Sequence, residues 1–232
     1  MSNKNDPLNI VSGRIALLGG TFNPIHIGHL RAAIEVSEAL DLLRVDLMPS
    51  ANPPHKSRAG ILPFDMRVEL LQASIKGEAK LGICDLESRL PSPSYTWNTA
   101  IEWEREHGVR PLFILGDIDF SQLQTWRNGC DLPQVTDMIV MPRSGSDTIF
   151  RKTIEKYWNE SKIDFLDKEK GIMMAKIKDG ICIFLPVPVL RISATQIRQK
   201  WIEGKSVQFL VPQGVFDLLK NKDAEVAMHW LQ

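Results

Sequence analysis

The chain has 232 residues, 44% of them hydrophobic, and its 28 Lys and Arg residues balance its 28 Asp and Glu residues. A chain of this length can bury one sizeable core, and its neutral, ordinary composition gives no sign of disorder or of a general attraction to nucleic acid or anionic membranes. We therefore expect a single domain over residues 1–232, with neither nucleic acid nor a membrane as partner.

The cysteines and the N-terminus indicate the compartment. Cys84, Cys130 and Cys182 are scattered, with no CxxC pair or Cys/His cluster, which argues against a disulfide framework and a structural zinc site. We expect no metal-ligating residues and a cytoplasmic location. Residues 1–13 lack the apolar core of a signal peptide and are expected to be flexible, and the apolar stretch at 182–190 is too short and too proline-broken to span a bilayer.

Short apolar runs alternate with helical patterns over the first 142 residues. The pattern predicts strands at about 14–20, 44–50, 81–87, 110–116 and 137–142, and helices at about 28–42 and 96–107. This alternation is typical of βαβ units, and runs such as LFIL, apolar at consecutive positions, are typical of strands buried on both faces. We expect an α/β fold, a doubly wound and mostly parallel sheet with helices on both faces.

The composition changes over residues 143–180, where charged residues become frequent: eleven of the twenty residues from Arg151 to Lys170 are charged. We interpret this segment as a charged surface excursion, partly helical. The apolar pattern returns at 181–187. The stretch ISATQIRQKWIEG at 192–204 has a Ser/Thr-led start and a Gly stop, which predicts a capped helix, and residues 211–222 predict a last helix.

The twelve residues from Gly19 onward read GGTFNPIHIGHL and join the first expected strand to the first expected helix. Gly19 and Gly20 let backbone N–H groups approach a ligand closely. Gly28 stands where the helix begins, and a helix N-terminus attracts phosphate. A single histidine there is usually an ordinary polar residue, but His26 and His29, three residues apart, can donate to one anion. The combination predicts a polyphosphate site at the carboxyl edge of the sheet.

These twelve residues resemble the signature of the nucleotidyltransferase superfamily with the (T/H)xGH motif. Residues 26–29 also spell the HIGH signature of class I aminoacyl-tRNA synthetases, but those enzymes need a lysine-rich loop and a tRNA-binding domain for which this chain has no room. Further stretches follow in order: NPPHK at 52–56, PSPSYTWNT at 91–99, FILGDIDFSQLQTW at 113–126, ISATQIR at 192–198 and LVPQGV at 210–215. Together, over about residues 14–219, they resemble bacterial nicotinate-nucleotide adenylyltransferases.

The resemblance implies a Rossmann-like fold with a C-terminal helical segment, and the reaction of ATP with nicotinate mononucleotide to nicotinate adenine dinucleotide and pyrophosphate in NAD biosynthesis. The attacking group in such a reaction is a phosphate, already ionised at neutral pH, so no general base is needed. Catalysis would rest on positioning and on neutralising charge. Mg²⁺ is expected as a cofactor carried by ATP, and the sequence leaves the oligomeric state open.

The site residues follow from the same resemblance. It assigns catalysis to His26, His29, Lys56 and Arg198, although a lysine in a proline-rich turn can be merely solvated. The implied ATP-binding residues are Gly19, Gly20, Thr21, Phe22, His26, Gly28, His29, Ile192, Ser193, Thr195 and Arg198. The implied nicotinate mononucleotide-binding residues are Gly20, Thr21, Phe22, Asn23, Lys56, Thr96, Gly116, Asp117 and Trp126, with Trp126 stacking on the nicotinate ring and backbone amides near Thr96 and Trp126 binding its carboxylate.

Simpler interpretations exist for two of these groups. Ser193 also fits a plain N-cap followed by a surface arginine, and Trp126 also fits burial.

The match departs from the family at three places. The family usually has Gly-Ala-Asp where this chain has Gly116, Asp117 and Ile118, so the usual acidic position is occupied by Ile118. Ala194 replaces a common serine, and Asn23 replaces the commoner aspartate. Two alternatives therefore stay open: a nucleotide-binding homologue without transferase activity, and a sibling enzyme that uses nicotinamide mononucleotide or phosphopantetheine.

Overall fold

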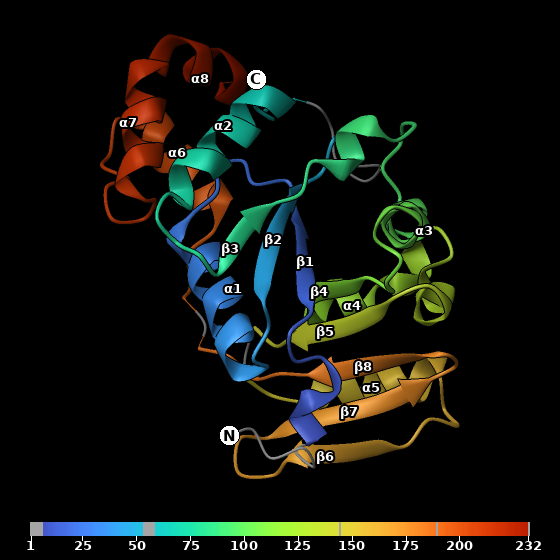
Figure 1. Ribbon diagram of the computed structural model, residues 1–232. Helices are drawn as coiled ribbons and strands as arrows, with labels where there is room; N and C mark the ends of the chain where they lie inside the picture. The colour runs from blue at the N-terminus through green and yellow to red at the C-terminus, as the bar shows by residue number, and fades with distance from the viewer. Residues whose placement is uncertain (1–6, 53–58, 144, 189, 232) are drawn as a thin grey trace.

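The computed structural model describes residues 7–52, 59–143, 145–188 and 190–231. At its centre is an eight-stranded sheet in the order β3-β2-β1-β4-β5-β8-β7-β6 (Figure 1). The strands are β1 (Ile15–Gly20), β2 (Arg44–Pro49), β3 (Leu81–Ile83), β4 (Leu112–Gly116), β5 (Asp137–Met141), β6 (Ile163–Asp167), β7 (Ile172–Ile177) and β8 (Gly180–Phe184). The six strands from β3 to β8 in that order run parallel, and β7 and β6 continue the sheet antiparallel.

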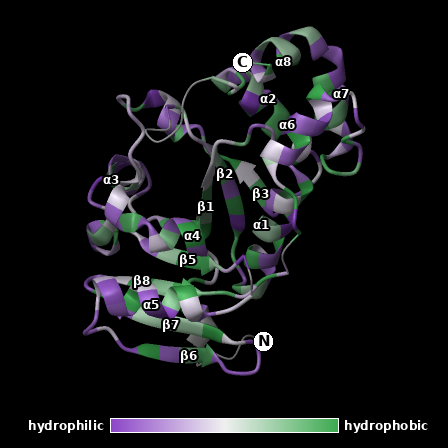
Figure 2. Ribbon diagram, turned by 180° about the vertical axis from the view of Figure 1, so that it is seen from behind, coloured by the Kyte–Doolittle hydropathy of each residue, from purple (hydrophilic) through white to green (hydrophobic). Residues whose placement is uncertain are grey.

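Helices cover both faces of the sheet. They are α1 (Ile27–Ala39), α2 (Phe64–Ser74), α3 (Thr96–His107), α4 (Asp117–Ser121), α5 (Thr148–Tyr157), α6 (Ala194–Ile202), α7 (Gln213–Asn221) and α8 (Asp223–Trp230). Successive strand residues face opposite sides, so Ala16 and Leu18 pack with the helices α1, α2, α6, α7 and α8, while Leu17 packs with α3. The doubly wound α/β fold is confirmed, and Figure 2 shows the apolar residues concentrated on its strands.

The strand order fixes where a ligand can bind. β1 lies between β2 and β4, and the chain first winds outward from β1 to β3 and then returns to β4 and winds the other way. The carboxyl ends of β1 and β4 therefore meet at the point where the strand order reverses, which is the usual ligand position in such sheets. No helix among the described residues is long and apolar enough to cross a membrane.

The prediction for residues 143–180 is wrong in its main point. A helix is present, α5, but the rest forms β6 and β7, which extend the sheet, so the segment is not a surface excursion. Phe150, Ile154 and Met173 are buried in a core cluster between this segment and β5 and β8. The charged residues lie on the outer sides of these elements, which is why composition alone suggested a surface segment.

Other boundaries also differ from expectation. Of the N-terminus expected to be flexible, residues 1–6 lie outside the described residues, but Val11 is fully buried and the Gly13 N–H donates to the Asp41 carbonyl at 2.8 Å. The first helix ends at Ala39 rather than Leu42, because Asp41 adopts a left-handed backbone with φ of 47°. The helix at 213–221 is not the last, since α8 follows it.

Helix α2, which the apolar pattern did not reveal, carries the buried cation Arg67. Its side chain is 2% exposed, and its guanidinium donates to the carbonyls of Leu62 at 3.0 Å, Thr21 at 2.8 Å and Ser50 at 2.9 Å. Thr21 and Ser50 directly follow β1 and β2. Arg67 therefore fixes the carboxyl ends of two central strands and supplies donors to three carbonyls, in one buried and two partly buried hydrogen bonds.

We expect Arg67→Met to lower the free energy of unfolding by about 3 kcal/mol, because three carbonyls lose their donor at once. Urea unfolding at pH 7 measures this. Arg105→Met is the matched control, since Arg105 lies on the surface of α3 and pairs with Glu102 only three residues away. A loss no larger than that of the control would show that Arg67 does not hold these strand ends.

Candidate active site

The loop from β1 to α1 lies at the carboxyl edge of the sheet. A Cβ on Gly20 would lie 2.9 Å from Cε1 of Phe22 and would displace that ring, whereas a Cβ on Gly19 would have its nearest neighbour, Met48 Cε, at 4.0 Å. Phe22 has a left-handed backbone with φ of 48°, and its side chain is buried. The Phe22 ring therefore packs inward, which leaves the backbone of Thr21 and Phe22 as the part of this turn that a ligand could contact.

His26 and His29 stack on each other at the start of α1. Their ring centroids lie 3.6 Å apart with the planes inclined by 21°, and Phe22 packs edge-on against His29. His26 is the N-cap residue, and the N–H of Ile27, the first residue of the helix, donates to the Leu210 carbonyl at 3.0 Å. The two imidazoles thus lie on one side of the junction, as their spacing predicted. The N–H of Ile27 already bonds to Leu210, so this donor of the helix start is not available to a ligand.

Gly28 allows His26 to pack tightly. A Cβ on Gly28 would lie 3.0 Å from Nδ1 of His26, whose side chain is only 4% exposed. This Nδ1 is buried and has no hydrogen-bond partner among the described residues. Burial lowers the pKa of His26 from 6.5 to about 4. His26 is therefore neutral at pH 7, and a neutral imidazole can still donate one hydrogen bond to an anion.

Helix α6 brings Arg198 to the same loop. The guanidinium donates to the Asn23 carbonyl at 2.8 Å and to Oγ1 of Thr195 at 3.3 Å, and partial burial lowers the pKa of Arg198. Ser193 is the N-cap of α6: its Oγ accepts from the Gln196 N–H, and the Gln196 side chain accepts from the Ser193 N–H, both at 3.2 Å. The predicted capped helix is confirmed, and its start lies beside the histidine loop.

Ile192, which precedes this cap, packs partly buried against the main core cluster.

The residues expected at the pyridine end come from α3 and the turn after α4. Thr96 is the first residue of α3, so its N–H has no acceptor within that helix. Trp126 packs against a core cluster, and its own N–H donates to the Leu123 carbonyl at 2.9 Å. The Arg127 guanidinium lies 5.1 Å from the centre of the Tyr95 ring, which brings the two segments together. The Trp126 amide is thus already bonded, whereas the first residue of α3 has an N–H that the helix itself does not use.

The acidic residues after β4 differ in accessibility. Asp117 is 1% exposed, and its Oδ1 accepts from the Ile118 N–H at 2.9 Å, while its Oδ2 has no partner among the described residues. Ile118 is 38% exposed. Asp119 is exposed, and its Oδ2 lies 3.4 Å from the place a Cβ would occupy on Gly116. Asp119, which the sequence analysis did not select, is therefore the accessible acid at the end of β4.

The predicted Lys56 lies outside the described residues. Glu87, a buried carboxylate, was missed. It accepts from the Ala51 N–H at 3.2 Å and bonds to the hydroxyls of Ser94 and Thr99, and burial raises its pKa. It thereby joins the segment after β2 to the start of α3. No motif marks Glu87, because it lies in a short 3₁₀ turn (Leu86–Arg89) of mixed composition.

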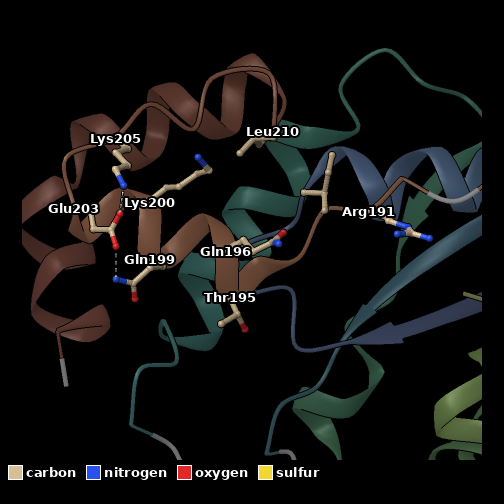
Figure 3. A pocket seen from close by; sticks show the side chains of 9 residues that line it. Arg191, Thr195, Gln196, Gln199, Lys200, Glu203, Lys205 and Leu210 are labelled. Atoms are coloured by element: carbon tan, nitrogen blue, oxygen red, sulfur yellow. Dashed lines mark hydrogen bonds and ion pairs between the residues drawn. The ribbon is translucent and has the colours of Figure 1, made fainter.

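A pocket of about 610 Å³ runs along the outer side of α6 (Figure 3). Its lining includes Ile192 and Thr195, so it adjoins the predicted ATP-binding residues. Arg191, Lys200 and Lys205 make the lining basic, and Lys205 pairs with Glu203 at 2.7 Å. The outer side of α6 thus carries positive charge, from Arg191 before its start and from Lys200 and Lys205 at its C-terminal end, in addition to Arg198.

Among the described residues, no group of three or more His, Cys, Asp and Glu side chains is placed to hold a metal ion.

Comparison with known proteins agrees with this arrangement. The profile of the cytidylyltransferase-like family matches residues 17–200. A protein of Clostridium acetobutylicum named "Probable nicotinate-nucleotide adenylyltransferase" is 35% identical over 207 residues, which cover 89% of this chain and 96% of the relative. A protein of the same name from Pseudomonas syringae pv. tomato is 36% identical over 204 residues, 87% of this chain and 89% of the relative. The chain belongs to the nicotinate-nucleotide adenylyltransferase family.

A solved structure supports the fold assignment. The nicotinic acid mononucleotide adenylyltransferase of Plasmodium falciparum, complexed with NaAD, superposes with a TM-score of 0.68 over 94% of this chain and 99% of that one, at 16% sequence identity. The match to the cytidylyltransferase-like family, at residues 17–200, extends from within β1 to within α6 and includes the histidine loop and Arg198.

The burial of His26 makes stability depend on pH. Its pKa of about 4 in the folded state lies below the 6.5 of an exposed imidazole, so the unfolded chain takes up the proton first as the pH falls. The contribution is present above pH 6.5 and is lost as the pH falls toward 4. Between pH 7 and pH 5 we expect His26 to account for a loss of about 2 kcal/mol.

Urea unfolding of the wild type and of His26→Gln at both pH values isolates this contribution. The variant should lose about 2 kcal/mol less stability than the wild type on going to pH 5. Equal losses in the two proteins would contradict a buried, neutral His26.

Proposed function

We propose that the protein transfers the adenylyl group of ATP to nicotinate mononucleotide. An oxygen of the mononucleotide phosphate attacks the α-phosphorus of ATP, the bond from that phosphorus to the bridging oxygen of the β-phosphate breaks, and pyrophosphate leaves. The observation that carries the proposal is the stacked pair His26 and His29 at the start of α1, in a loop whose Asn23 carbonyl binds Arg198. Three nitrogenous groups suited to phosphate thus converge on one loop.

The charges of the reacting phosphate and of the nearby side chains support this proposal. The attacking phosphate is ionised at neutral pH, so the reaction needs donors and positive charge rather than a general base. Neutral His26 offers a hydrogen bond without a charge, and Arg198 supplies a permanent charge nearby. Mg²⁺ would be carried by the triphosphate, where its positive charge would lower the repulsion between phosphates.

The acceptor end is supported by α3. Its first residue, Thr96, has an N–H directed out of the helix start, where the helix dipole favours an anion such as the nicotinate carboxylate. A neutral carboxamide gains less from such a donor. In our proposal Trp126 contributes its ring, because its amide already bonds to the Leu123 carbonyl. Asp119 binds a ribose hydroxyl, in place of the acidic residue that the family usually has at the position of Ile118.

Pyrophosphate release from ATP and Mg²⁺ with each acceptor tests the proposal. We expect turnover with nicotinate mononucleotide and much less with nicotinamide mononucleotide or phosphopantetheine. A preference for either of the latter would overturn the acceptor, and no release with any acceptor would overturn adenylyl transfer.

The histidines have a separate test. His26→Ala and His29→Ala should each lower kcat about a hundredfold, because each removes one preorganised donor to the phosphates. His107→Ala is the matched control, since His107 stacks on Trp103 near the end of α3 and bonds to the Trp103 carbonyl. Steady-state kinetics, with circular dichroism to verify folding, measures the effect, and variants as active as the control would remove the histidines from the mechanism.

A further inference from the structure

Asn23 is the structural centre of the histidine loop. Asn23 is 4% exposed, and its side-chain amide and backbone carbonyl are bonded to residues of three other segments. The side-chain Oδ1 accepts from the Leu62 N–H at 3.1 Å and from the indole N–H of Trp230 at 3.2 Å, and Nδ2 donates to the Gly60 carbonyl at 2.6 Å. The backbone carbonyl accepts from Arg198 at 2.8 Å. One residue thus connects the loop with the turn before α2, with α6 and with α8.

These partners determine the orientation of the Asn23 amide. Two N–H donors face one end of the side chain and a carbonyl faces the other, so the oxygen must point toward Leu62 and Trp230 and the nitrogen toward Gly60. An aspartate could accept from the same two donors but would place a second negative oxygen against the Gly60 carbonyl. Asparagine is therefore the residue that fits this network.

Trp230, like Asn23, is buried and packed against a neighbouring segment. It ends α8, its side chain is 5% exposed, and the Trp201 ring of α6 packs edge-on against it with centroids 6.2 Å apart. Helices α6, α7 and α8 lie together at one end of the molecule, next to α2 (Figure 1). Trp230 therefore reaches from the last helix of the chain to the loop that carries the histidines.

We propose that Trp230 is a positioning residue for the phosphate site. Its indole N–H fixes the orientation of the Asn23 side-chain amide. The position of Asn23 in turn determines where its backbone carbonyl binds Arg198 and where the segment that leads to His26 begins. The inference rests on the proposed function only in taking the histidines and Arg198 as phosphate ligands. Trp230 is only 5% exposed and donates to the Asn23 side chain, so in this proposal helix α8 acts on the reaction through Asn23.

Trp230→Phe tests the inference, because it removes the indole N–H and keeps an aromatic ring against Trp201. Trp201→Phe is the matched control, since it makes the same change in the same cluster on the residue that contacts Trp230 through its ring. We expect Trp230→Phe to lower kcat/KM for ATP about tenfold, the effect of one buried hydrogen bond, and to leave the KM for nicotinate mononucleotide unchanged. Kinetics are measured well below the unfolding temperature of every variant.

A second comparison separates positioning from general destabilisation. In an Asn23→Ala background, Trp230→Phe should cause no further loss of kcat/KM, because its target is already absent. Equal kinetics for Trp230→Phe and Trp201→Phe, or a full additive loss in the Asn23→Ala background, would overturn the positioning role. If the wild type releases no pyrophosphate, the proposed function fails. The dissociation constants of ATP from the two tryptophan variants then test the positioning role. Weaker binding by Trp230→Phe than by Trp201→Phe supports it, and equal dissociation constants overturn it.

Discussion

The loop between β1 and α1 is held by hydrogen bonds from several sides, and the arrangement of the proposed phosphate site depends on this constraint. Arg67 binds the carbonyl of Thr21 from α2, Arg198 binds the carbonyl of Asn23 from α6, and Trp230 binds the Asn23 side chain from α8. Hydrogen bonds to backbone carbonyls fix the path of a loop irrespective of its side chains. A turn with a left-handed Phe22 is thereby kept in one conformation, which gives the histidines a defined direction.

This rigidity has an electrostatic purpose. A buried, neutral His26 stacked on His29 exchanges little solvation when an anion arrives, and preorganised donors of this kind lose little energy to reorganisation. Gly28 contributes by leaving room for the ring rather than by flexibility. The positive charge comes from Arg198 and from the basic side of α6. The proposed site thus combines two fixed imidazoles, of which His26 is neutral at pH 7, with nearby cations, which suits a reaction between two phosphates.

Local signals in the sequence predicted the parts of the site that depend on local structure. The strand, glycines and histidines of the opening motif, the exact span of α3, and the Ser193 cap all follow from patterns within a few residues. Helix α2 was missed because Arg67 lies on its buried face, where an apolar residue is usual, and so interrupts the apolar pattern of the helix. Strand β6 was missed because it carries acidic residues and lies within the charged stretch 151–170, and β7 was missed because it follows that stretch, although its sequence IMMAKI is mostly apolar. The hydrogen bond between Trp230 and Asn23 spans 207 residues and leaves no local trace.

A crystal structure with Mg²⁺ and a non-hydrolysable ATP analogue tests the central claim most directly. The account predicts phosphate oxygens within about 3 Å of a ring nitrogen of both His26 and His29, with Arg198 still bonded to the Asn23 carbonyl. Phosphates lying instead along Lys200 and Lys205 in the outer pocket of α6, with the two imidazoles stacked and far from any phosphorus atom, would contradict it.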